Sequence, residues 1–157
     1  MNKWLMDKLC FCGATGFGLG FLPFAPGSFG SLLGIPIFLL TNSWSPWLQG
    51  ILFATFCLVS IGLSEKIERE SRVQDPSFVV IDEVVGMWIT LFFLWRTDWI
   101  VIGLGFLLFR SFDVLKFFPL NIFESFRGGV GIVADDLAAG MLANICLRII
   151  LLSGILG

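Results

Sequence analysis

Long apolar runs separated by short polar loops are the feature that most constrains the fold of this chain. Only 14% of its residues are charged and 57% are hydrophobic, whereas about a quarter of the residues of a soluble domain are charged. A membrane-spanning helix needs about 20 mostly apolar residues. Runs near this length cover residues 29–40, 47–63, 78–95, 99–112 and 130–152. The sequence therefore predicts an all-α integral membrane protein, a compact bundle of about four to five transmembrane helices.

The length of the chain predicts a single domain. Its 157 residues leave room for about four spans and their loops, so residues 1–157 are expected to form one transmembrane unit. The Gly/Pro-rich stretch 13–30 is compatible with a re-entrant path, which is tolerated where protein or a water-filled cavity satisfies the backbone. Its glycines and prolines also interrupt the apolar core of a signal peptide, so we expect the N-terminus to be retained.

Basic residues in the loops predict the orientation of these helices. The loops at residues 64–77 and 110–129 hold three basic residues each, whereas loops 41–46 and 96–98 hold one between them. Because cytoplasmic loops carry an excess of Lys and Arg, the two basic loops and the N-terminus are predicted to face the cytoplasm. The charge run at 65–70 is interpreted as part of this solvated cytoplasmic face.

Two pairs of adjacent acids, Asp82-Glu83 and Asp135-Asp136, lie near the start of apolar runs at that same face. A charge at membrane depth costs roughly 2.5–3.5 kcal/mol, so such acids indicate a functional site with a cationic partner. The chain has no histidine, and carboxylate oxygens suit Mg²⁺. All four acids are candidate metal ligands, with Asp82 and Asp135 as the first choice and Asp113 as a further candidate.

Neighbouring acids on a helix point about 100° apart. One member of each pair is therefore expected to reach a central metal, while the other binds a second metal, meets a basic partner or caps its helix. Each pair is also followed closely by a glycine, Gly86 or Gly140. Glycine in an apolar helix favours close helix packing, which we prefer to an internal duplication as the explanation of this shared form.

A second set of residues is suited to binding phosphate. Arg110, Asp113 and Lys116 are spaced i, i+3 and i+6, so they lie near one helical face; the alternative is an interfacial ion pair with a lysine that extends to the membrane surface. The stretch 18–31 offers backbone amides and the hydroxyls of Ser28 and Ser31 before a helix, where an anion can bind. Its alternative role is that of a connector.

Together these blocks resemble the phosphatidylglycerophosphatase A family of bacterial membrane lipid phosphatases. The resemblance rests on residues 18–31, 82–89, 109–116 and 128–140. It implies a Mg²⁺-dependent phosphomonoesterase that removes the terminal phosphate of phosphatidylglycerophosphate to give phosphatidylglycerol. It also implies a multi-pass protein of the cytoplasmic (inner) membrane with its active site toward the cytoplasm. The sequence shows no obligate protein partner.

Asp82, Glu83, Asp135 and Asp136 match the acids of the family, and Arg110, Asp113 and Lys116 match its basic block, whereas the roles of individual residues are our own inference. The expected catalytic residues are Asp82, Glu83, Asp135, Asp136 and Asp113, and the first four are the expected metal ligands. The expected phosphate contacts are Arg110, Lys116, Arg127, Ser28 and Ser31. Two positions depart from the family pattern, because Phe117 replaces a usual proline and Arg127 stands where a histidine is frequent.

Other classes of function fit the sequence less well than a phosphatase does. A small membrane transporter or ion-coupled carrier also uses intramembrane acids, but it predicts acids at the membrane midplane. A phosphotransferase that joins alcohols to cytidine-activated lipids would need a longer, spaced Asp/Gly signature that is absent. The net charge of −2 argues against a nucleic-acid partner. The four cysteines lack metal-ligand spacing and are interpreted as inert apolar side chains.

Overall fold

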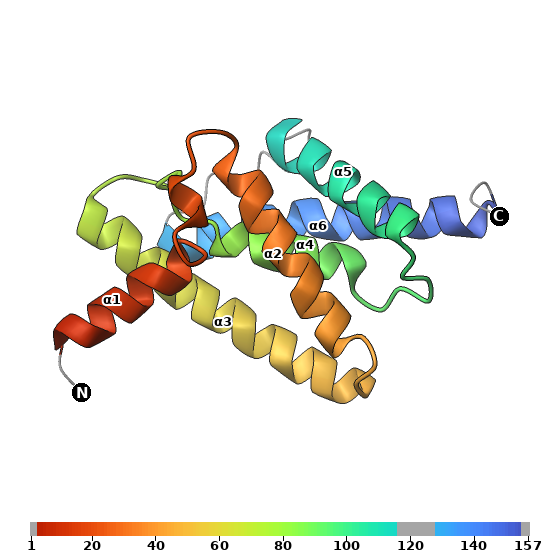
Figure 1. The fold of residues 1–157 in the computed structure, drawn as a ribbon, viewed down its shortest axis with the longest axis horizontal. Coiled ribbons are helices and arrows are strands. Elements are labelled where there is room, and N and C mark those ends of the chain that lie inside the picture. The colour runs from red at the N-terminus through yellow and green to blue at the C-terminus, as the bar shows by residue number, and fades with distance from the viewer. Residues whose placement is uncertain (1–2, 116–127, 155–157) are drawn as a thin grey trace.

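The computed structural model describes residues 3–115 and 128–154, and its secondary structure in these two ranges is entirely helical, which confirms the all-α prediction. Figure 1 shows the arrangement of the elements. Their bounds are α1 Lys3–Ala14, a 3₁₀ turn η1 Leu19–Phe21, α2 Pro26–Thr41, α3 Pro46–Ser71, α4 Ile81–Leu91, α5 Trp99–Leu115 and α6 Gly128–Leu152.

Two of these helices, α3 and α6, are long and apolar enough to cross a membrane by length and composition. Only 17% of the most apolar window of α3 is buried inside the protein, so this helix presents an extensive apolar surface outward. The apolar helix α2 is shorter, with 16 residues. The number of membrane spans, four to five, stays a prediction.

The helix expected across residues 78–95 is shorter than predicted. The helix α4 covers 11 residues, or about 16 Å at 1.5 Å per residue. Its backbone becomes extended at Phe92, and Phe93 has a positive φ of 54°. The apolar run is thus divided between a short helix and a turn, which hydropathy cannot distinguish from one longer helix.

The Gly/Pro-rich segment packs against the residues that lead into α4. The Val80 N–H donates a hydrogen bond to the Ala14 carbonyl at 2.9 Å. At Gly20, an added Cβ would lie 2.0 Å from the Phe78 carbonyl oxygen, so only glycine permits this approach. The segment therefore helps to position the start of α4.

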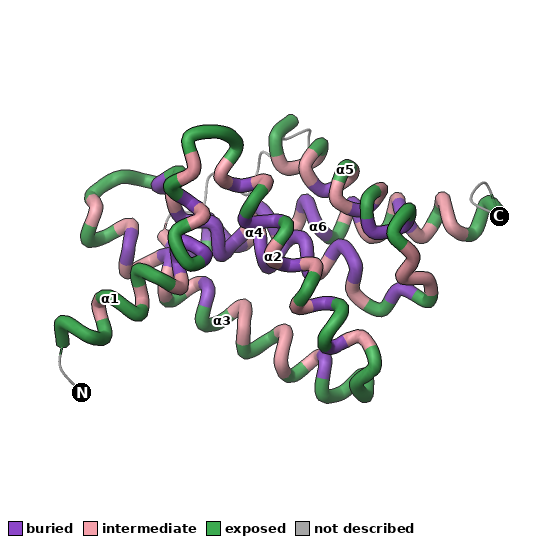
Figure 2. The backbone as a smooth tube through the Cα atoms, viewed as in Figure 1, coloured by how far each residue is buried: buried purple, intermediate pink, exposed green. Residues whose placement is uncertain are grey.

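The helix α4 forms the centre of the molecule, since nine of its 11 residues are buried. Figure 2 shows the buried residues gathered along α4 and the part of α6 beside it. The fully buried Trp88 meets the rings of Phe53 and Phe56 edge-on, with centroids 5.4 and 5.6 Å away. Aromatic pairs of this geometry add to the stabilisation from apolar burial.

The helices α4 and α6 run side by side in the same direction (Figure 1). They touch through Gly86 and Gly140, and a Cβ on Gly140 would lie 2.3 Å from the Gly86 carbonyl oxygen. One turn further on, the Thr90 hydroxyl donates a hydrogen bond to the Gly86 carbonyl at 2.8 Å. The same hydroxyl lies 3.4 Å from the Gly140 carbonyl oxygen. The glycines thus allow the close packing that their position after the acid pairs predicted.

Candidate active site

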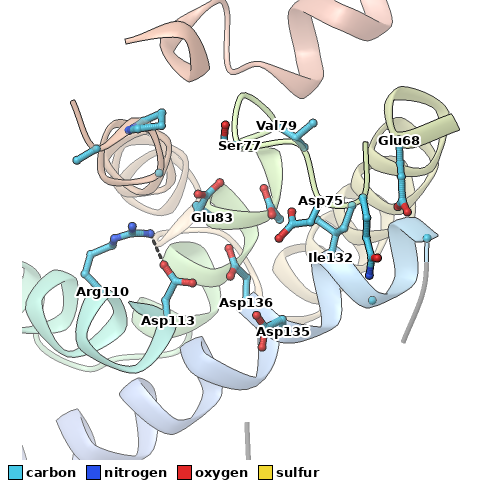
Figure 3. A pocket seen from close by; sticks show the side chains of 17 residues that line it. Glu68, Asp75, Ser77, Val79, Glu83, Arg110, Asp113, Ile132, Asp135 and Asp136 are labelled. Carbon is cyan, nitrogen blue, oxygen red and sulfur yellow. Dashed lines mark hydrogen bonds and ion pairs between the residues drawn. The ribbon is translucent and has the colours of Figure 1, made fainter. Parts of the chain in front are cut away.

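A pocket of about 630 Å³ lies where α2, α4 and α6 begin and α3 and α5 end (Figure 3). The two acid pairs, which were expected at the same face, meet here, and Arg110, Asp113 and the start of α2 join them. The pocket is lined by Ala25, Pro26, Gly27, Glu68, Gln74, Asp75, Ser77, Val79, Asp82, Glu83, Arg110, Asp113, Gly128, Gly131, Ile132, Asp135 and Asp136.

Three carboxylates in this pocket form a compact group. One oxygen each of Asp82, Glu83 and Asp136 lies within 4.8 Å of the other two. The side chains come from the first turn of α4 and the third turn of α6, and the glycine contact one turn later holds the two helices close enough for them to meet. The packing of α4 on α6 therefore builds the group.

The burial of these carboxylates indicates what they can bind. Asp82 is 7% exposed and Asp136 is 4% exposed. One oxygen of each of the three side chains is buried without a hydrogen-bond partner among the described residues. Buried carboxylates this close repel one another and are costly unless they are paired with a cation. The donor set, oxygen only, fits a hard divalent ion such as Mg²⁺.

The two acid pairs contribute unequally to this group. On α4 both Asp82 and Glu83 reach it, which the 100° separation of neighbours did not predict; the extra methylene of Glu83 gives it the longer reach. On α6 the group includes Asp136, whereas Asp135 lines the same pocket outside it. The choice of Asp135 as a direct ligand stays a prediction, and the geometry favours Asp136.

Arg110 enters the pocket from the last turns of α5. Its guanidinium pairs with Asp113, the ion pair named above as the alternative interpretation of this spacing, and both side chains are largely buried. The Arg110 Nε is also buried without a partner among the described residues. The paired carboxylate holds the guanidinium in place, and the remaining donors are available to an anion.

The first turn of α2 fits between Glu83 and Arg110. A Cβ added to Gly27 would lie 2.2 Å from Glu83 Oε1 and 3.0 Å from Arg110 Nη2. Only glycine can occupy this position without moving both side chains. The close approach brings the amino-terminal end of a helix, which favours anions, to the edge of the carboxylate group.

Two of the predicted phosphate contacts, Ser28 and Ser31, are not brought to the pocket. Ser28 and Ser31 are not among its lining residues, and the buried Ser31 hydroxyl donates to the Gly27 carbonyl at 2.7 Å. Lys116 and Arg127 lie outside the described residues, as does Phe117. The roles of these residues stay predictions.

The interpretation of residues 65–70 as a solvated face is wrong for Glu68, and Glu65, with 34% of its side chain exposed, makes specific contacts. Glu68 lines the pocket, and its Oε2 is buried without a partner among the described residues. Glu65 accepts a hydrogen bond from the Gly129 N–H at 2.7 Å and pairs with Arg69 at 2.6 Å. The sequence contains a signal, because these acids share a face at i and i+3, but it does not show that α6 begins against that face.

Comparison with known proteins identifies the family of this chain. The sequence model of the family described as "Phosphatidylglycerophosphatase A" matches residues 12–151. Over 143 residues, 86% of this chain and 89% of the relative, the chain is 41% identical to a Bacteroides thetaiotaomicron protein named "Putative phosphatidylinositol-3-phosphatase".

Two further relatives carry the family name. The chain is 36% identical to phosphatidylglycerophosphatase A of Escherichia coli K12, over 83% of this chain and 76% of the relative. It is 37% identical to phosphatidylglycerophosphatase A of Haemophilus influenzae Rd, over 84% of this chain and 82% of the relative. No solved structure matches the chain significantly. From the extent of these matches, the chain belongs to the phosphatidylglycerophosphatase A family.

Proposed function

We propose that this protein hydrolyses the terminal phosphomonoester of phosphatidylglycerophosphate, releasing phosphate and phosphatidylglycerol, with Mg²⁺ as its cofactor. The observation that carries the proposal is the buried group of Asp82, Glu83 and Asp136 beside Arg110 in a single pocket. Family membership supplies the expected substrate. Nothing in the comparisons supports the alternative of a transporter.

The three grouped carboxylates would hold the magnesium ion, with Asp135 beside them. When bound, the ion would neutralise charge on the phosphoryl oxygens and make water a better nucleophile. Without a cation, the negatively charged carboxylates would repel a phosphate dianion. They could also donate no hydrogen bond to it, because ionised Asp and Glu can only accept. The pocket therefore suits a phosphate that arrives together with a divalent ion.

The basic side of the pocket would orient the substrate. Arg110 can donate to two phosphate oxygens at once, which fixes the direction of the phosphorus as well as neutralising charge. Asp113 prevents the guanidinium from turning away. The start of α2 at Pro26–Gly27 adds a weaker attraction for anions from the same side.

The reaction needs a proton acceptor and a proton donor. Water forms a new bond to phosphorus while the bond from phosphorus to the glycerol oxygen breaks, and the released alkoxide takes up a proton. Asp135 and Asp113 line the pocket outside the three grouped carboxylates. We assign them as candidates to accept the proton of the attacking water and to deliver one to the leaving alcohol.

A multi-pass position in the bacterial cytoplasmic membrane, with the pocket toward the cytoplasm, is part of the proposal. The apolar helices α3 and α6 support it. Exposed Trp44 and Trp47 lie where α2 meets α3, and exposed Trp95 and Trp99 lie between α4 and α5, at the helix ends opposite the pocket. Tryptophans collect at membrane interfaces, so these four are expected to mark the outer one.

Phosphate release from phosphatidylglycerophosphate by the purified protein in detergent tests the proposal. We expect release with Mg²⁺, none with a chelator, and strongly reduced release by Asp135→Asn. Phosphatidylinositol 3-phosphate should be assayed in parallel because the name of the Bacteroides relative refers to that lipid. A well-folded protein that releases no phosphate from either lipid would contradict the proposal.

Glu65 offers a test of how the amino-terminal end of α6 is held. Its carboxylate accepts from Gly129, and Gly128 has a φ of 78° and leaves no room for a Cβ beside Glu65 Oε2. We expect Glu65→Ala to lower phosphate release about tenfold, at the low end of what is typical when a side chain that orients metal ligands is lost. Glu65→Gln keeps an acceptor oxygen and should retain most activity. Equal losses in both variants would mean that the charge, and not the hydrogen bond, matters.

A further inference from the structure

The carboxyl end of α4 is held by two side chains of α6. The Asn144 Nδ2 donates to the carbonyls of Ile89, Thr90 and Phe92 at 3.2, 2.8 and 3.1 Å. The Arg148 Nη2 donates to those of Phe92 and Phe93 at 3.0 and 2.8 Å. Asn144 and Arg148 are called the polar clamp below.

The clamp supplies hydrogen-bond donors to the last carbonyls of α4. The last carbonyls of any helix have no partners within it, and α4 ends after 11 residues amid apolar side chains. Unsatisfied carbonyls in such surroundings are costly. In addition, a cation at the carboxyl end of a helix is favourable, and Arg148 is the one basic residue of α6.

Within the clamp, the two side chains orient each other. The Arg148 Nε donates to Asn144 Oδ1 at 2.7 Å. Because a guanidinium can only donate, this bond turns the amide oxygen toward Arg148 and the amide nitrogen toward the carbonyls of α4. Neither residue can be replaced without disturbing the contacts of the other.

The clamp and the carboxylates lie at opposite ends of one helix pair. Along α6, residues Asp136, Gly140, Asn144 and Arg148 follow at intervals of four, and along α4 Asp82, Gly86 and Thr90 do the same. Residues four apart lie on one side of a helix. One side of α6 therefore bears a carboxylate, the glycine contact and the clamp, in this order along the helix.

We infer that Asn144 and Arg148 are positioning residues, which set the depth and rotation of α4 against α6 and so hold Asp82 and Glu83 beside Asp136. They lie at the end of α4 opposite the pocket and are not among its lining residues. Mutual repulsion of the carboxylates pushes α4 away from α6 at the pocket end. The hydrogen bonds of the clamp oppose any sliding or turning of α4 that would relieve it. This inference rests on the proposed metal site.

Direct binding of Mn²⁺ to the full chain in detergent, followed by electron paramagnetic resonance, tests the clamp apart from activity. We expect Asn144→Leu and Arg148→Met to weaken Mn²⁺ binding about tenfold, in the range known for side chains that orient metal ligands. The same variants should lower kcat with little change in KM, because the substrate contacts are not touched. Arg148→Lys keeps the charge and most of the packing, so Mn²⁺ binding can be measured on this variant if Asn144→Leu does not fold.

Gln49→Leu is a matched control. Gln49 is buried, and its Nε2 donates to the carbonyls of Asn42 and Trp44 at the end of α2, at 3.2 and 2.9 Å. Its loss should lower the melting temperature but leave Mn²⁺ binding within about twofold of wild type, since no metal ligand depends on it.

Two outcomes would count against the inference, and they can be told apart. If every folded clamp variant binds Mn²⁺ as tightly as wild type, the clamp only stabilises the fold and the inference is overturned. If the wild-type protein neither binds Mn²⁺ nor releases phosphate, the proposed function itself fails, and the positioning role fails with it.

Discussion

Asp136→Asn is expected to lower phosphate release at saturating substrate on the order of 10³-fold, the equivalent of about 4 kcal/mol of transition-state stabilisation. Asp136 is buried, and one of its oxygens lies in the group formed with Asp82 and Glu83. Asparagine has nearly the same shape but no charge, so it removes attraction for a cation while keeping the packing. Activity measured over a range of Mg²⁺ concentrations should show that the variant needs more Mg²⁺ than the wild type to reach its maximal rate.

Asp135→Asn is the comparison that distinguishes a direct metal ligand on α6 from a residue that transfers protons. Asp135 neighbours Asp136 on α6 and lines the same pocket outside the three grouped carboxylates. If Asp136 is a direct ligand and Asp135 handles protons, Asp136→Asn should shift the Mg²⁺ requirement, and Asp135→Asn should lower kcat at an unchanged requirement. The reverse pattern would restore Asp135 as the direct ligand. Full activity in both variants would exclude a carboxylate site on α6.

Gly140→Ala is expected to lower activity about 100-fold, because a displacement near 1 Å can cost that much in a positioned site. The added Cβ would lie 2.3 Å from the Gly86 carbonyl oxygen and 2.4 Å from Ile89 Cγ2. The first of these is backbone, so the two helices must separate, and Asp82 then moves away from Asp136. Overpacking of this kind also costs about 1–3 kcal/mol of stability, which a thermal melt in detergent would detect.

Gly62→Ala and Gly103→Ala are matched controls for this substitution. Both glycines lie inside helices, α3 and α5, and a Cβ on either would meet nothing within 4 Å. Alanine at such positions is favoured by about 1 kcal/mol through helix propensity alone, so activity should be retained and stability unchanged or higher. If Gly140→Ala behaved like these controls, the close contact between α4 and α6 would not set the geometry of the site.

Much of the site could be predicted from residues that are adjacent in the chain. The acid pairs, the Arg110–Asp113 spacing and the glycine after each acid pair were visible in the sequence. The structure places the acids and Arg110 around one pocket and the two glycines in contact one turn further along. Such patterns are predictable because the spacing along one helix determines which of its residues share a face. The starts of two helices were not read from their prolines: the apolar runs were placed from residues 29 and 47, whereas Pro26 and Pro46 occupy the first helical positions of α2 and α3, where proline is favoured.

Other features depended on where one helix lies against another. The sequence does not show that α4 ends at Leu91, because the apolar run continues and the carbonyls released there are satisfied by Asn144 and Arg148, more than 50 residues away. It does not show that Glu65 and Glu68 face α6 and the pocket. These contacts join residues distant in the chain, and hydropathy contains no information about them.

The sequence by itself determined the helical class, the family and the chemistry available, which is that of carboxylate oxygens and basic side chains. Only the tertiary structure decided that Asp136 joins Asp82 and Glu83, while Asp135 lies outside their group. The physical reason is that spacing sets the direction of a side chain around its own helix, whereas the relative rotation and depth of two helices are set by their contact. Here that contact is the approach of Gly86 and Gly140 and the hydrogen bonds of the polar clamp.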